Sequence, residues 1–155
     1  MFGKFKKILG IEGVKLELIV PEKVSKDTGI VTGIIRLTSL SDNNLLESIE
    51  VVMTEKYFRG KKENQLIDEY PMGKILVKKP VSISKEDVIE IPFELNFVYV
   101  KSEMDKIEEK NFLSKGLVRL AKKLRGVKSE YYIKADARIK GNTLSPFDKK
   151  PIQLV

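Results

Sequence analysis

The chain has 155 residues, of which 42% are hydrophobic and 33% are charged. A chain of this length buries roughly two thirds of the surface that its unfolded form exposes, so one domain can fold without disulfides or metal ions. The sequence contains no cysteine and no histidine. This inventory excludes disulfides, thiolate nucleophiles, Ser-His-Asp catalysis and zinc sites built from these residues, and it is compatible with a reducing cytoplasm.

The net charge of +7 is concentrated in two short segments. Residues 110–128 hold seven Lys or Arg and no acid, and residues 1–10 hold three Lys. The other 19 bases are opposed by 22 acids, so the rest of the chain is mildly acidic. The high isoelectric point therefore indicates two local basic patches and not a basic surface everywhere.

The N-terminal segment lacks the pattern of a secretory signal. Lysines at 4, 6 and 7 precede two apolar residues, but charged residues at 12, 15 and 17 interrupt the apolar run. No uncharged stretch approaches the roughly 18 residues that a membrane-spanning helix requires. We expect a cytoplasmic protein. The basic segments suggest an alternative, in which the protein binds peripherally to the inner face of the membrane.

The first half of the chain has strand patterns. Apolar and polar residues alternate from Val14 to Val20, which predicts a strand with one buried face. Residues 29–39 and 46–58 are rich in β-branched side chains and are bounded by polar turns, and this favours two further strands.

The second half continues the pattern. The polar run 59–65 predicts a hairpin tip leading to a strand that ends near Val77. Alternation predicts strands over 89–97 and 131–139, and Pro92, which lacks an N–H, indicates an edge position or a bulge. Short strands separated by turns, without alternating helices, indicate an all-β, immunoglobulin-like sandwich.

Residues 101–126 are the exception, because their periodicity is helical. Ser102 and Asp105 fit a capping box, and Gly126 stands where a helix C-cap glycine is expected. We therefore expect an amphipathic helical insertion near 102–125 with one apolar stripe. The stripe consists of Leu113, Leu117, Leu120, Ala121 and Leu124.

The basic helix has three interpretations. Its leucines can pack on the sandwich while its cations stay solvated, or the helix and the leader 1–10 can bind an anionic membrane surface, or the cations can meet an acidic protein partner. The cations proposed to contact an anionic surface are Lys4, Lys6, Lys7, Lys115, Arg119, Lys122, Lys123 and Arg125. Only Phe112 is aromatic within the basic segment, so the pattern does not favour nucleic acid.

The sequence offers little that is typical of an enzyme. It has no phosphate-binding loop, dinucleotide fingerprint or calcium loop, so we expect no catalytic residue, cofactor or metal. Paired carboxylates could still serve a hydrolase of the glycosidase type, although solvated strand faces explain the same acids. The acids concerned are Glu47, Glu50, Asp68, Glu69, Glu90 and Glu94.

Several motifs, taken in order, carry a family resemblance. They are FGKFKKILGIEGVKLEL, DTGIVTGIIRL, VVMTEKYFRG, EIPFEL, YYIKADARIKG and SPFDKKPIQLV, the last with an Asp-Lys-Lys turn before the final strand. In this order the sequence resembles the bacterial sporulation-control proteins with an arrestin-like fold. The resemblance implies a single arrestin-like sandwich over residues 1–155 that acts as a non-enzymatic regulatory or scaffolding module and binds a protein partner. Longer members of that family carry a second β-domain.

Overall fold

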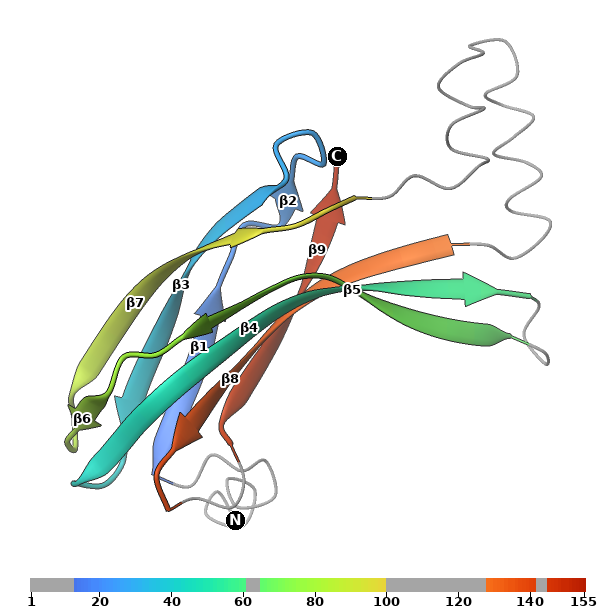
Figure 1. Cartoon of the computed structure of the whole chain (residues 1–155). Helices are drawn as coiled ribbons and strands as arrows, with labels where there is room; N and C mark the ends of the chain where they lie inside the picture. Colours follow the sequence, from blue (N-terminus) through green and yellow to red (C-terminus); the bar gives the residue numbers. More distant parts are fainter. Residues whose placement is uncertain (1–12, 61–64, 100–127, 142–144) are drawn as a thin grey trace, which may run out of the picture.

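The computed structural model describes residues 13–60, 65–99, 128–141 and 145–155, and the regular structure in these ranges is entirely strand (Figure 1). The strands are β1 (Val14–Ile19), β2 (Lys23–Val24), β3 (Ile30–Ser39), β4 (Asn44–Arg59), β5 (Leu66–Val77), β6 (Val81–Ile83), β7 (Val88–Asn96), β8 (Lys128–Ile139) and β9 (Phe147–Leu154). The helix expected near 102–125 lies outside the described residues.

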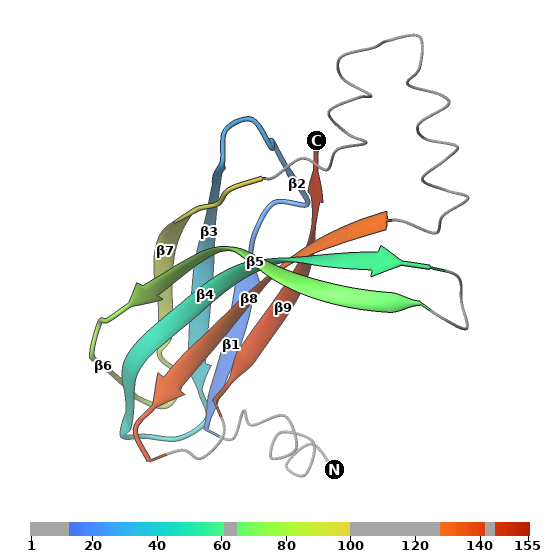
Figure 2. The same ribbon diagram turned by 45° about the vertical axis from the view of Figure 1, so that its right-hand side comes forward.

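The strands form two sheets that pack face to face (Figures 1 and 2). One sheet has three strands in the order β1-β3-β7. The other has six strands, in the order β2-β9-β8-β4-β5, with β6 paired to the start of β4. Strand pairs are antiparallel except β2 with β9. The predicted all-β fold is confirmed, and its arrangement is that of a β-sandwich.

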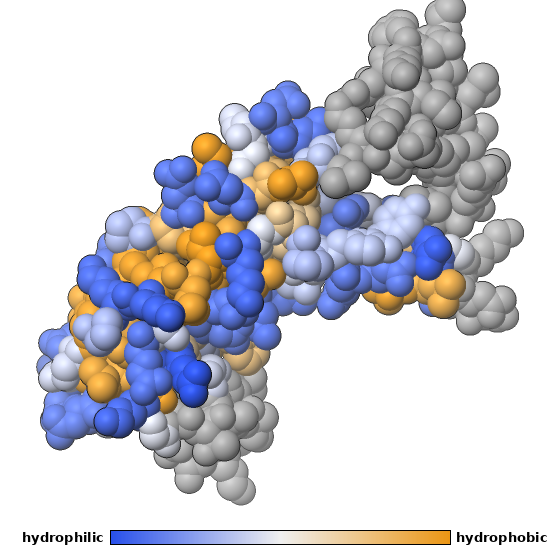
Figure 3. Space-filling view, viewed as in Figure 1, coloured by the Kyte–Doolittle hydropathy of each residue, from blue (hydrophilic) through white to orange (hydrophobic). Residues whose placement is uncertain are grey.

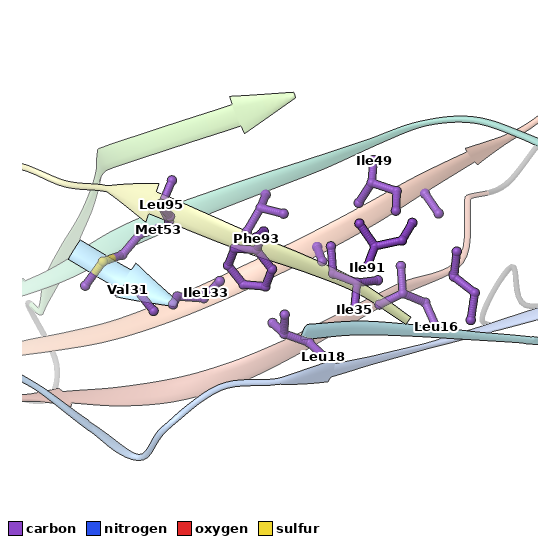
Figure 4. Packing of buried hydrophobic residues seen from close by; sticks show 14 of the residues in the cluster. Leu16, Leu18, Val31, Ile35, Ile49, Met53, Ile91, Phe93, Leu95 and Ile133 are labelled. Carbon is purple, nitrogen blue, oxygen red and sulfur yellow. The ribbon is translucent and has the colours of Figure 1, made fainter. Parts of the chain in front are cut away.

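The core explains why alternating sequences form these strands. Every second side chain of a strand points to the same face, so the apolar set of each sheet meets the other between the two layers (Figure 4). Three examples are fully buried: Ile35 of β3, Ile49 of β4 and Ile133 of β8. Burying one such side chain contributes about 1.5–3 kcal/mol to folding.

The predicted pairing of the two hairpin strands and the edge position of Pro92 are confirmed, and residues 61–64 of the expected tip lie outside the described residues. β4 pairs with β5 in an antiparallel hairpin, with a shift in register between Met53 and Thr54. Pro92 belongs to β7, the end strand of its sheet, and lies opposite Ile34 of β3. An edge position suits proline, because its missing N–H can face away from the neighbouring strand.

The C-terminal prediction needs a correction. Asp148, Lys149 and Lys150 were expected to form a turn before the last strand, but they lie within β9 and pair with β8. The strand forms because Asp148 and Ile152 occupy inward positions and Asp148 accepts a hydrogen bond from the neighbouring β1. Asp148 thus occupies an inward-facing position of β9 where the alternating pattern would place an apolar residue.

Candidate binding groove

Strands β8 and β9 diverge at one end and form a fork (Figure 2). They pair from Asp136 and Phe147 as far as Tyr131 and Ile152. Beyond that point β9 pairs with β2, whereas β8 continues beside β4 alone, so its residues 128–130 have one edge that is unpaired among the described residues. A groove of about 650 Å³ lies at this fork.

Tyr132 is the central side chain of the groove. The Lys149 ammonium lies 3.9 Å from the centre of its ring, and the Lys56 ammonium lies 5.9 Å from it. Its hydroxyl donates to Glu69 Oε1 at 3.4 Å. Lys56 is also 4.0 Å from Glu69, whereas Lys149 takes part in no ion pair among the described residues. Lys149 is thus a cation that the ring positions but no described carboxylate neutralises.

Tyr131 also lines the fork, and its hydroxyl stays protonated at neutral pH. Burial raises the pKa of its hydroxyl above the ordinary value, and the nearby Glu55 carboxylate raises it further. Ser129 Oγ donates to Glu55 Oε2 at 2.7 Å, and the Tyr131 ring stacks at a tilt on Tyr99. Tyr131 therefore remains a neutral hydrogen-bond donor and does not act as a base.

The outer face of the six-stranded sheet is close to electrically balanced. Its cations and acids alternate, and its ion pairs are Lys56–Glu69, Lys74–Glu50, Lys128–Glu130, Lys134–Asp136 and Arg138–Glu47. Exposed pairs of this kind contribute only about 0–1 kcal/mol each. Because the charges cancel locally, this face does not present the continuous positive stripe that nucleic acid requires.

The acids that could have served a hydrolase lie on strands, and most of them form ion pairs. Glu90 pairs with Arg36 at 3.3 Å and Asp68 with Arg59 at 2.8 Å, and Glu94 is exposed on β7. Among the described residues, no group of three or more acids could hold a metal ion. None of the six acids lines the groove at the fork, and Glu47, Glu50 and Glu69 each form an ion pair with a basic side chain on the outer face.

The cations predicted to contact an anionic surface, in residues 1–10 and 111–126, lie outside the described residues. In the described part of the chain, no helix is long and apolar enough to cross a membrane. The groove residues were missed at the level of sequence. The tyrosine pair 131–132 and the lysine pair 149–150 were visible, but only the pairing of β8 with β9 places Tyr132 beside Lys149.

The fold is similar to that of a solved sporulation-control protein. No protein-family profile matches the sequence, and no curated protein matches it. The crystal structure of Spo0M, a sporulation control protein from Bacillus subtilis, superposes with a TM-score of 0.64 at 13% sequence identity. The match covers 93% of this chain and 50% of Spo0M, so the chain spans about half the length of that protein. At this level of identity the likeness shows a shared fold: this chain has the β-sandwich architecture found in Spo0M.

Proposed function

We propose that the protein is a non-enzymatic regulatory or scaffolding module that binds a protein partner through the groove at the fork of β8 and β9. The resemblance to sporulation-control proteins and the fold shared with Spo0M support a regulatory role. The observation that supports the site is the fork itself, where a strand edge, the Tyr132 ring and Lys149 meet; Lys149 has no ion pair among the residues that the structure describes.

The chemistry of the groove favours an extended, acidic segment of the partner. The unpaired edge of residues 128–130 can accept main-chain hydrogen bonds from an added strand. Tyr132 and Pro151 supply apolar contact area beside it, and Lys149 supplies a cation for a carboxylate. A carboxylate near Lys149 forms a stronger, charge-assisted hydrogen bond than a neutral group does.

Site-specific crosslinking tests this proposal. A photo-crosslinking amino acid replaces Gln153, which lines the groove, and the matched control replaces Lys74, which lies on the same sheet face outside the groove. We expect the Gln153 probe to crosslink one partner in cells and the Lys74 probe not to do so. Adding Lys149→Glu should abolish the crosslink, and equal crosslinking with and without that substitution would contradict the groove as the binding site.

A further inference from the structure

The free edges of β7 and β5 face one another along one flank of the sandwich, and we call this flank the seam. It is formed by β7, Val88–Asn96, and by residues 73–77 of β5, each in the end strand of its sheet. At one end Val98 N donates to Met72 O at 3.0 Å and holds the two edges together. At the other end the turn from β6 leads directly into β7.

The seam is incompletely covered because the two sheets differ in width. Ile75 and Val77 pair with Val51 and Ile49, which are fully buried, so all four side chains point toward the core. Ile75 and Val77 are nevertheless only half-buried, as is Ile89 at the start of β7. Hydrophobic surface accordingly shows along β7 and toward β5 (Figure 3). In the described residues no strand lies beside β7 to cover β5.

Within the described part of the chain, the outer edge of β7 between Val88 and Asn96 has main-chain groups that pair with no other strand. Successive residues of an antiparallel strand direct their N–H and C=O groups to opposite sides. Phe97 N donates toward β3, to Gly29 O, and Val98 N donates outward to β5. By this alternation Glu90 and Glu94 direct their N–H groups outward, and the missing N–H of Pro92 falls on the same outward side.

The charges on β7 determine which kind of strand can pair with its free edge. Glu90 and Glu94 are exposed on the outer face. Glu90 shares the Arg36 guanidinium with Glu17, so this cluster keeps a net negative charge, and Glu94 takes no part in the ion pairs of the described residues. A second copy that paired through β7 in a register centred on Pro92 would place Glu90 opposite Glu94, and like charges directly opposite destabilise a strand pair. A strand with Lys or Arg at the facing positions would instead meet opposite charges.

We propose that the seam binds an extended strand of a partner protein in which apolar residues alternate with Lys or Arg. The strand adds to the edge of β7, its apolar side chains cover Ile75, Val77 and Ile89, and its basic side chains face Glu90 and Glu94. The three-stranded sheet thereby becomes four-stranded and comes closer in width to the six-stranded sheet that it packs against. This second site is separate from the groove at the fork, which is suited to an acidic segment.

Fluorescence anisotropy with synthetic peptides tests the proposal. The probe is a labelled nine-residue peptide with valine at odd positions and lysine at even positions. One control replaces each lysine by glutamate, and a second carries N-methyl groups on alternate residues so that it cannot pair as a strand. We expect the lysine peptide to bind at least tenfold more tightly than either control, even though the protein carries a net charge of +7.

Substitutions in β7 test whether the peptide binds at the seam. Glu90→Lys combined with Glu94→Lys should weaken the lysine peptide about tenfold and favour the glutamate peptide, because two facing charge pairs change sign. Glu94→Pro, which removes an outward N–H, should weaken both peptides, and its thermal unfolding checks that the fold survives. Lys149→Glu should leave peptide binding at the seam unchanged, so the two sites can fail independently. Absence of binding, or equal binding to the charge-reversed variant, overturns the proposal.

Discussion

Asp148 connects two strands that lie 130 positions apart in the sequence. Its Oδ2 atom accepts a hydrogen bond from Leu18 N at 2.8 Å, and its side chain is only 25% exposed. Leu18 belongs to β1, the end strand of the three-stranded sheet, so this carboxylate satisfies an edge N–H across the boundary between the two sheets. Asp148 thereby links β1 to β9 on the flank of the sandwich opposite the seam.

Removing that carboxylate should destabilise the protein measurably. Asp148→Ala leaves the Leu18 N–H without its partner, and we expect a loss of about 1–3 kcal/mol in the free energy of unfolding. Urea denaturation followed by circular dichroism measures the change. Lys150→Ala is the control, because Lys150 lies 3.7 Å from Asp148 but does not contact Leu18. Equal midpoints for Asp148→Ala and Lys150→Ala would show that the hydrogen bond contributes nothing.

Tyr131 makes stability depend on pH in the alkaline range. Its pKa is higher in the folded state than the unfolded value near 10, because burial and Glu55 disfavour the phenolate. The unfolded state therefore loses its proton first, and the free energy of unfolding should decrease as pH rises above 10. Tyr131→Phe should remove this part of the decrease. Chemical denaturation of both proteins at pH 8 and near pH 11 gives the comparison, and parallel decreases would contradict the assignment.

At the scale of the elements, the main chain of β5 comes close to the end of β7 at Gly73. A side chain at Gly73 would clash with the main-chain oxygen of Asn96, and the adjacent Met72 accepts the hydrogen bond from Val98 N. Glycine is therefore required at this position by a close approach between two main chains. It fixes where the seam closes.

Gly73→Ala should separate the two edges and destabilise the fold. Main chain cannot yield as a flexible side chain can, so we expect a cost of about 1–3 kcal/mol. Thermal unfolding measures it, and Lys74→Ala, at the next and exposed position, serves as the control. Hydrogen exchange of the Val98 amide should also accelerate in Gly73→Ala. An unchanged melting temperature together with unchanged exchange would show that the approach is not constrained.

Sequence periodicity predicts where strands lie in the chain better than it predicts which strands pair with each other. The strands containing Leu16, Ile91 and Ile133 follow from alternation, because burial of one face imposes the same period on the sequence. The short strands β2 and β6 have two and three residues, which is too few to show a period. The fork was not predictable, because the departure of β9 from β8 depends on its pairing with β2 at the far end of the chain.

At the scale of the whole molecule, β9 joins parts of the chain that are far apart in the sequence. It pairs with β8 on one side and with β2 on the other, and it contacts β1 of the opposite sheet through Asp148. Its partners come from both the first and the last parts of the sequence. Small single domains usually unfold in one cooperative transition, and we expect β9 to take part in it because it contacts both sheets.

Deleting residues 147–155 should therefore abolish cooperative folding and not merely remove one strand. We expect the truncated chain to lack a thermal transition in near-ultraviolet circular dichroism. Lys149→Ala in the full chain is the control, because it changes the surface of β9 without removing its pairing. A truncated chain that still unfolded in a single sharp transition would mean that β9 is peripheral to the core.

The unequal width of the two sheets also bears on solubility. An uncovered strand edge with apolar side chains beneath it is a common starting point for aggregation, and natural proteins protect such edges with charged residues and proline. On β7 that protection consists of Glu90, Pro92 and Glu94. In the binding mode proposed for the seam, the same three residues would oppose pairing of identical copies and favour a strand of opposite charge, so one set of side chains would govern both resistance to aggregation and choice of partner.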